Sequence, residues 1–213
     1  DRDLLPAHIL LFKVLVRQEN GHTRAEKNRE EDKILEILQA AHSKEADYLE
    51  GFRNLKRHRY YDAVKALQRA ILSGDSSIPT YRDLAECYYQ VNEVEKAQEQ
   101  IDNIMSSGNR KINNAFILDL ASKIAISQGK FDKATELLDK QSLVDHPENV
   151  EHRKATYEIK KGNYPKAFEH ATNACNGERV LPQMHLLRMN IAIHLEDWKT
   201  AEEEYKKIDE LYK

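Results

Sequence analysis

The feature that most constrains the fold of this chain is a short motif that recurs at an almost constant interval. The segment GKFDKATEL at residues 129–137 and the segment GNYPKAFEH at residues 162–170 share a glycine, an aromatic residue and an alanine in the same order. The motif aligns on alanines that follow one another at intervals of 34, 37, 33 and 34 residues: Ala63, Ala97, Ala134, Ala167 and Ala201. A period of this length is typical of a solenoid built from helix pairs.

Each period repeats the same order of large, small and turn-forming residues. A large residue stands three positions before the alanine, and apolar or small residues that follow it by four and seven positions fall on the same helix face. A turn precedes each large residue, at His58, Asn92, Gly129, Gly162 and Glu196. A second small residue stands twelve positions before four of the alanines: Gly51, Ala85, Ser122 and Ala155. Because small side chains let two helices approach closely, the pattern predicts antiparallel hairpins that cross at these positions.

The second period carries the most complete version of the motif, with Tyr81, Leu84, Ala85, Tyr88, Ala97 and Ile101. These residues resemble the tetratricopeptide repeat (TPR) family, and the resemblance covers about residues 44–213. It implies an all-α fold, a right-handed α-solenoid of stacked antiparallel helix pairs. We expect five TPR-like repeats, at about residues 44–77, 78–112, 115–147, 148–181 and 182–213. The chain departs from the family by lacking its usual proline between most units.

Residues 1–43 precede the repeats and predict two more helices, at 3–19 and about 24–43. The second carries an apolar stripe of Ile34, Leu35, Ile37, Leu38 and Ala41. The apolar run in the first contains His8, Lys13 and Arg17 and is too short to span a bilayer, so it should pack against protein. We expect a capping pair or the remnant of a neighbouring domain. The chain starts without Met, which suggests a segment of a larger parent protein.

Charge and cysteine content narrow the class of protein. The 33 basic and 36 acidic residues give a formal net charge of -3, which disfavours non-specific nucleic-acid binding. An RNA-binding helical-repeat protein fits poorly for the same reason. Cys87 and Cys175 lie far apart within helical patterns, which favours buried thiols and a reducing, cytoplasmic location. We expect neither a nucleic-acid partner nor membrane insertion.

No catalytic or cofactor motif is present in the sequence. It lacks a glycine-rich phosphate loop, CxxC, HExxH and a serine in a nucleophile turn. The spacings of His146 with His152 and of His185 with His194 differ from the i, i+4 spacing of helical metal ligands. We therefore expect no enzyme activity, no cofactor and no metal site. The basic cluster at residues 56–59 is expected to complement a helix C-terminus, and the alternative is a contact with phosphate, a nucleic-acid backbone or an acidic partner.

The concave side of such a solenoid is lined by the first helix of each pair, which is where a partner would bind. The repeat register predicts a partner-binding groove formed by Tyr48, Phe52, Lys56, Arg82, Glu86, Tyr89, Lys123, His152, Arg153, Lys160, Asn190 and His194. Aromatic anchors mixed with long cations suit a peptide or protein helix that carries acidic groups.

The family resemblance also permits a test for one known type of partner. TPR domains that capture a chaperone's C-terminal carboxylate use a clamp of Lys or Asn, then Asn, then Lys or Arg on three consecutive first helices. In this chain the corresponding places hold Tyr48 and Phe52, then Asp83, then Phe116 and Leu120. The clamp is absent, which disfavours binding of a chaperone tail.

The sequence thus favours a protein–protein interaction scaffold that binds a peptide or protein in its concave groove, as part of a larger protein or complex. The alternative is a sensor or regulatory arm of a multidomain enzyme whose catalytic domain lies outside this segment. The apolar N-terminal helix motivates that alternative. We expect a monomer or weak homodimer. Two copies could also associate end to end through Tyr205, Ile208, Leu211 and Tyr212.

Overall fold

The described part of the chain consists of helices joined by short turns. The computed structural model describes residues 4–17, 24–106 and 114–211, and these residues contain no strand. The first six helices are α1 (Leu5–Arg17), α2 (Arg24–Ala40), α3 (Ala46–Lys56), α4 (Tyr60–Leu72), α5 (Ile78–Gln90) and α6 (Val94–Ser106). The next six are α7 (Ala115–Ser127), α8 (Phe131–Gln141), α9 (Pro147–Lys160), α10 (Tyr164–Cys175), α11 (Pro182–His194) and α12 (Trp198–Leu211). None of the described helices is long and apolar enough to cross a membrane.

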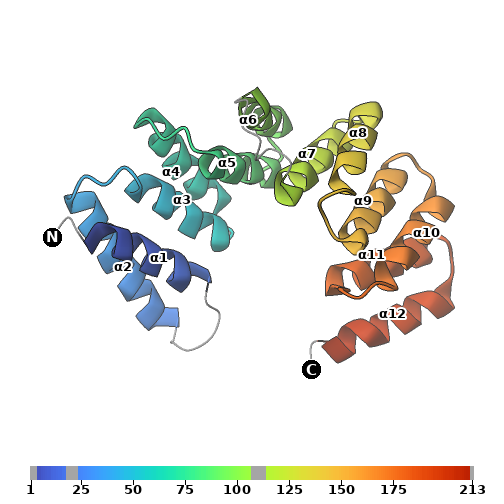
Figure 1. Cartoon of the computed structure of the whole chain (residues 1–213). Coiled ribbons are helices and arrows are strands. Elements are labelled where there is room, and N and C mark those ends of the chain that lie inside the picture. Colours follow the sequence, from blue (N-terminus) through green and yellow to red (C-terminus); the bar gives the residue numbers. More distant parts are fainter. Residues whose placement is uncertain (1–3, 18–23, 107–113, 212–213) are drawn as a thin grey trace. The chain divides into compact units, whose positions relative to one another are not determined.

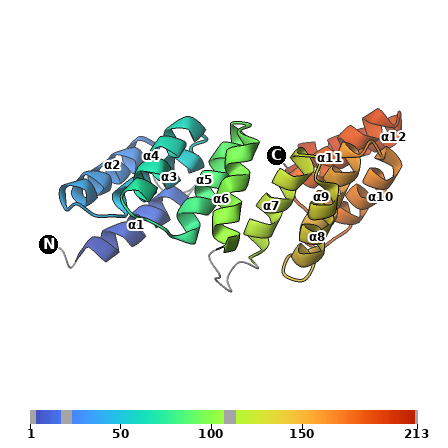
Figure 2. The same cartoon turned by 90° about the horizontal axis from the view of Figure 1, so that it is seen from above.

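The helices form hairpins that fall into two compact units, Asp1–Gly108 and Asn109–Lys213. Unit 1 holds the hairpins α1–α2, α3–α4 and α5–α6, and unit 2 holds α7–α8, α9–α10 and α11–α12. Within each unit every hairpin contacts the next one along the chain, and both views show this stacking (Figure 1, Figure 2). The all-α solenoid of stacked helix pairs that the sequence predicts is therefore confirmed, whereas the domain and repeat boundaries remain predictions.

The repeated small residues lie where the two helices of a hairpin meet. The alanines at 63, 97, 134 and 167 are fully buried, and Ala201 is 8% exposed. On the first helices, Gly51 is buried and Ala85, Ser122 and Ala155 have no exposed surface. A Cβ atom added to Gly51 would lie 2.6 Å from Cγ of Leu67 on the partner helix. The helices of this hairpin are thus closer than any larger residue permits.

The turns inside the hairpins share one backbone conformation. The predicted turn residues all have positive φ angles: His58 (57°), Asn92 (61°), Gly129 (69°), Gly162 (77°) and Glu196 (61°). In each case the next residue's N–H donates to a carbonyl five positions earlier, as in Lys130 to Ala125 and Asn163 to Glu158, both 2.9 Å. This pattern satisfies carbonyls that the helix end would otherwise leave unpaired. Three of the five turns accomplish it without glycine.

The N-terminal hairpin packs onto the first predicted repeat. Its core consists of Phe12, Leu15, Ile34, Leu35 and Leu38, and these side chains contact Ala46 and Leu49 of α3. The predicted apolar stripe of α2 is only partly buried, since Ile37 is 43% exposed. On α1, Leu10, Leu11 and Val14 remain exposed to solvent.

Candidate functional site

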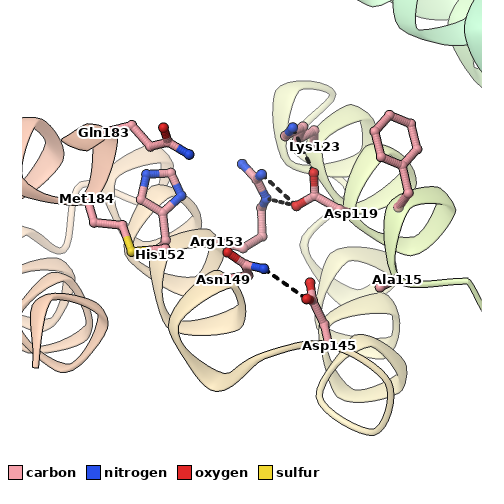
Figure 3. A pocket seen from close by; sticks show the side chains of 10 residues that line it. Ala115, Asp119, Lys123, Asp145, Asn149, His152, Arg153, Gln183 and Met184 are labelled. Atoms are coloured by element: carbon pink, nitrogen blue, oxygen red, sulfur yellow. Dashed lines mark hydrogen bonds and ion pairs between the residues drawn. The ribbon is translucent and has the colours of Figure 1, made fainter. Parts of the chain in front are cut away.

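A cleft of about 450 Å³ opens on the side of unit 2 where the first helices of its three hairpins meet. Its walls come from α7, α9 and α11, with further residues from the turn that precedes α9. The lining residues are Ala115, Phe116, Asp119, Lys123, Asp145, Asn149, His152, Arg153, Gln183 and Met184 (Figure 3). The cleft lies within one unit, so its geometry does not depend on how the units are arranged.

One carboxylate on α7 pairs with both basic side chains of the cleft. Arg153 on α9 donates to Oδ1 of Asp119 through Nε at 2.9 Å and through Nη2 at 2.6 Å. Lys123, one turn further along α7, lies 2.7 Å from the other oxygen. Burial alone would raise the pKa of Asp119, but the two cations outweigh burial and lower that pKa below its usual value. Asp119 therefore stays ionised and offsets part of the positive charge of Lys123 and Arg153.

The remaining polar groups of the cleft are the amides of Asn149 and Gln183, the His152 imidazole and the Asp145 carboxylate. Asn149 donates from Nδ2 to Oδ1 of Asp145 at 2.9 Å, which fixes the orientation of its side chain. His152 is half-buried, and burial together with the Arg153 charge lowers its pKa to about 4. Figure 3 shows the Gln183 amide on the same side of the cleft as His152. At neutral pH the two amides and the imidazole are uncharged hydrogen-bonding groups.

In unit 1, α1 covers much of the aromatic surface predicted for the groove. The rings of Tyr48 and Phe52 stack with their centres 6.2 Å apart. Two cations of α1 lie over them, with Lys13 Nζ 5.7 Å from the Tyr48 centre and the Arg17 guanidinium carbon 5.4 Å from the Phe52 centre. Lys56 reaches the Phe52 ring at 5.6 Å. Phe52 is only 3% exposed, so it offers almost no surface to a partner.

The charged groups of α5 are engaged in local contacts. Arg82 donates to Oδ1 of its neighbour Asp83 from both Nε (2.8 Å) and Nη2 (2.6 Å). The Tyr48 hydroxyl donates to the other Asp83 oxygen at 3.3 Å. Burial raises the pKa of Asp83 in spite of Arg82. Glu86 accepts a hydrogen bond from Gln90 at 2.6 Å.

The same arrangement of stacked hairpins occurs in solved structures, although sequence comparison finds no relative. No protein-family model matches the chain, and no curated protein sequence matches it. The structure of TTC0263, a TPR protein in Thermus thermophilus, has a TM-score of 0.67 with 15% identity, covering 79% of this chain and 91% of that chain. This chain has a TPR-like fold. A tetratricopeptide repeat protein from Parabacteroides merdae matches with a TM-score of 0.69 and 13% identity, over 92% of this chain and 78% of that one. PilW, a type IV pilus biogenesis factor, gives 0.74 with 12% identity, over 97% and 94%.

The other predicted groove residues lie outside the unit 2 cleft. Lys160 and Asn190 are exposed on α9 and α11, and Tyr89 is half-buried on α5. The His194 ring stacks on Tyr164 with centres 3.6 Å apart and an interplanar angle of 25°. The TPR-like register therefore brings only Lys123, His152 and Arg153 of the predicted set into one cleft.

Several lining residues were absent from the predicted groove. Asp119 precedes Arg153 by 34 residues, one repeat period, so the register could have placed the two side chains on adjacent first helices. Asn149 and Gln183 lie in the first turn of their helices, before the helix positions at which the repeat register predicts groove residues. Asp145 lies in a turn, where helical periodicity carries no information.

A cluster of possible metal ligands connects α10, α11 and α12. Ligand atoms of Cys175, His185 and Glu204 all lie within 4.8 Å of one another, a grouping that the sequence pattern did not reveal. Glu204 is fully buried and already contacts His185 Nδ1 at 2.6 Å, Arg188 at 2.7 Å and Lys207 at 2.9 Å. Burial and Glu204 raise the pKa of the Cys175 thiol to about 11. Because two cations already neutralise the carboxylate, we interpret the cluster as an ion-pair network of the last hairpin.

Proposed function

We propose that this chain is a binding scaffold and that the unit 2 cleft holds an extended peptide segment of a partner protein. The observation that carries the proposal is the composition of the cleft, whose two acidic and two basic side chains balance in number. Asp119 and Asp145 balance Lys123 and Arg153, while His152 is neutral at physiological pH. A cleft without excess charge has little attraction for a strongly acidic or basic ligand, but it can accommodate a peptide backbone.

Fixed amides supply the hydrogen-bonding capacity that a peptide backbone needs. The Asn149 Nδ2 group is held by Asp145, and the carbonyl oxygen of the same amide can accept from a peptide N–H. The Gln183 amide can both donate and accept. Phe116 is 50% exposed and offers apolar surface to a partner side chain. These groups lie on helices rather than loops, which supports binding without large rearrangement.

This proposal modifies the expectation of an acidic partner. Arg153 is 8% exposed and Asp119 holds it at 2.6 Å, so a ligand carboxylate would have to displace an existing ion pair. Recognition through amides should show only a weak dependence on ionic strength, because screening acts on charges. An acidic ligand bound by free cations would instead dissociate readily as salt is added.

Peptides selected from a display library on the immobilised chain provide the test, with binding measured by fluorescence anisotropy. We expect Gln183→Ala to weaken binding about 5-fold, the equivalent of one hydrogen bond. Asn190→Ala is the matched control, because Asn190 is exposed on the same helix but does not line the cleft. The proposal is wrong if no peptide binds saturably, or if both variants bind like the wild type.

A further inference from the structure

The connection between α10 and α11 contains an asparagine followed by a glycine. Asn176 follows the last residue of α10, and both Asn176 and Gly177 are exposed to solvent. This dipeptide is chemically reactive, because glycine has no Cβ that would keep its backbone nitrogen away from the asparagine side chain. The sequence contains one other copy of the dipeptide, Asn20–Gly21, which lies outside the described residues.

The reaction open to this dipeptide is loss of ammonia from the asparagine. The Gly177 nitrogen gives its proton to a base in the solvent and bonds to Cγ of Asn176, while the bond from Cγ to Nδ2 breaks and ammonia leaves. The product is a succinimide ring. Water opens the ring at either of its two carbonyl carbons, which leaves aspartate or isoaspartate at position 176. One water is consumed and one ammonia is released, so the reaction needs no oxidant or reductant.

The native backbone holds the reacting atoms apart. Ring closure requires the Gly177 nitrogen to lie on the same side of the Cα–C bond as Cβ of Asn176. The ψ angle of Asn176 is 2°, which places the Gly177 nitrogen alongside the backbone nitrogen of Asn176 instead. That backbone nitrogen donates to the carbonyl of Thr172 at 3.1 Å and is fixed by the end of α10. The chain after Asn176 must therefore rotate before the ring can form.

The Glu148 side chain holds the segment that would have to rotate. Its Oε1 atom accepts hydrogen bonds from the backbone N–H of Glu178 at 2.7 Å and of Arg179 at 3.3 Å. Glu148 is buried and lies in the first turn of α9. Hydrogen bonds from backbone N–H groups, its own first and then that of Arg179, lower the pKa of Glu148. The acceptor is therefore a carboxylate at neutral pH, which strengthens both hydrogen bonds.

Close packing of Glu148 also explains the glycine. A Cβ atom added to Gly177 would collide with Cγ and Oε1 of Glu148. Gly177 does not have a positive φ angle, so its backbone conformation does not itself require glycine. The residue that admits the Glu148 carboxylate is thus the same residue that makes Asn176 reactive.

We propose that Asn176 is a site of spontaneous deamidation and that the Glu148 carboxylate controls its rate by restraining the segment after Asn176. Reaction proceeds in molecules in which the hydrogen bonds to Glu148 have opened. Isoaspartate adds one carbon to the backbone between positions 176 and 177, so the N–H groups of Glu178 and Arg179 shift relative to Oε1. Modified molecules should therefore lose the restraint on this segment, which leads into α11 and the unit 2 cleft.

Incubation of the whole chain at mildly alkaline pH provides the test. Mass spectrometry of tryptic peptides 167–179 and 18–24 measures aspartate and isoaspartate at both Asn–Gly sites. Glu148→Ala removes the restraint, and Glu148→Gln retains the shape with an uncharged, weaker acceptor. Glu178→Gln is the matched control, because it removes an exposed carboxylate beside the site and keeps the N–H that Glu148 binds. Circular dichroism and Trp198 fluorescence verify that each variant is folded.

The expected results separate restraint by Glu148 from general reactivity. Asn176 in the native wild type should react at least about 10-fold more slowly than in the urea-unfolded chain, the equivalent of one charge-assisted hydrogen bond. Glu148→Ala should recover at least about 10-fold in rate, and Glu148→Gln should lie between it and the wild type.

Glu178→Gln should match the wild type, and Asn20 should react equally in all folded variants. The proposal is overturned if native Asn176 reacts as fast as unfolded Asn176. It is also overturned if both folded Glu148 variants react like the wild type at Asn176, or if they accelerate Asn20 to the same extent.

Discussion

Loss of the Asp119 carboxylate should destabilise unit 2, because two cations share it. The side-chain exposures are 10% for Arg153, 22% for Asp119 and 29% for Lys123. Breaking a fully buried ion pair costs about 3–5 kcal/mol, and the partial exposure of this one lowers our expectation for Asp119→Asn to about 2–3 kcal/mol. Arg153→Met should cost about 1–2 kcal/mol, because Lys123 still pairs with the carboxylate.

The double variant carries the decisive information. With both partners replaced, only the Lys123 ammonium is left without its counter-ion, and its 29% exposure keeps it in contact with water. Asp119→Asn/Arg153→Met should therefore lie within about 1 kcal/mol of the wild type. The two single costs should therefore fail to add by about 2 kcal/mol or more. Additive costs would refute the reasoning, since they would show that the two side chains act independently.

The assay is urea unfolding followed by tryptophan fluorescence. Trp198 is the only tryptophan in the sequence and lies on α12, so its signal follows unit 2. This matters because two compact units need not unfold as one transition. The lowered pKa of Asp119 adds a second readout. Its contribution is present above the unfolded-state pKa and is lost as pH falls through the lowered one, so the wild type and Asp119→Asn should converge in stability below about pH 4.

Three further predictions concern packing, histidine and thiols. Gly51→Ala should destabilise unit 1 by about 1 kcal/mol in urea unfolding, because the clash with Leu67 exceeds the gain in helix propensity; unchanged or higher stability would contradict this. Unit 2 should lose about 1–2 kcal/mol as pH falls from 7 to 5, since unfolded histidine takes up a proton that His152, with a pKa of about 4, does not; His152→Gln should remove that part of the pH dependence. Cys87 is fully buried, with a pKa raised to about 12, so it should react with a thiol reagent at pH 8 only after unfolding, and fast labelling of the native Cys175→Ser variant would contradict its burial.

The fold was predictable because the repeated residues are themselves the packing device. Small side chains at 63 and 51 set how closely two helices approach, and this information is local to each repeat. The turns were predictable for a related reason. In three of the five predicted turns the residue with positive φ is His58, Asn92 or Glu196, so the position within the repeat identified the turn where glycine did not. Recurrence strengthened a signal that is weak in any single turn.

The candidate site was less predictable because register fixes the face of a residue but not its exposure or its partners. Phe52 lies on the predicted face, yet cations of α1 and α3 cover its ring. Arg153 also lies there, yet Asp119 neutralises it. Both outcomes depend on side chains from other helices. The register can place Asp119 and Arg153 on adjacent first helices, but it does not show that these two side chains pair with each other.

These pairings decide which substitutions can report on partner binding. Charge reversal at Arg153 would place a second carboxylate beside Asp119 at a position that is 8% exposed. Loss of binding in such a variant would follow from unfolding as readily as from a damaged cleft, since like charges in contact are strongly unfavourable when buried. Gln183 lines the same cleft but is exposed. A substitution of Gln183 changes hydrogen bonding in the cleft and leaves the Asp119–Arg153 ion pair intact. Substitutions of Gln183 therefore report on peptide binding, whereas substitutions of Arg153 report mainly on the stability of the fold.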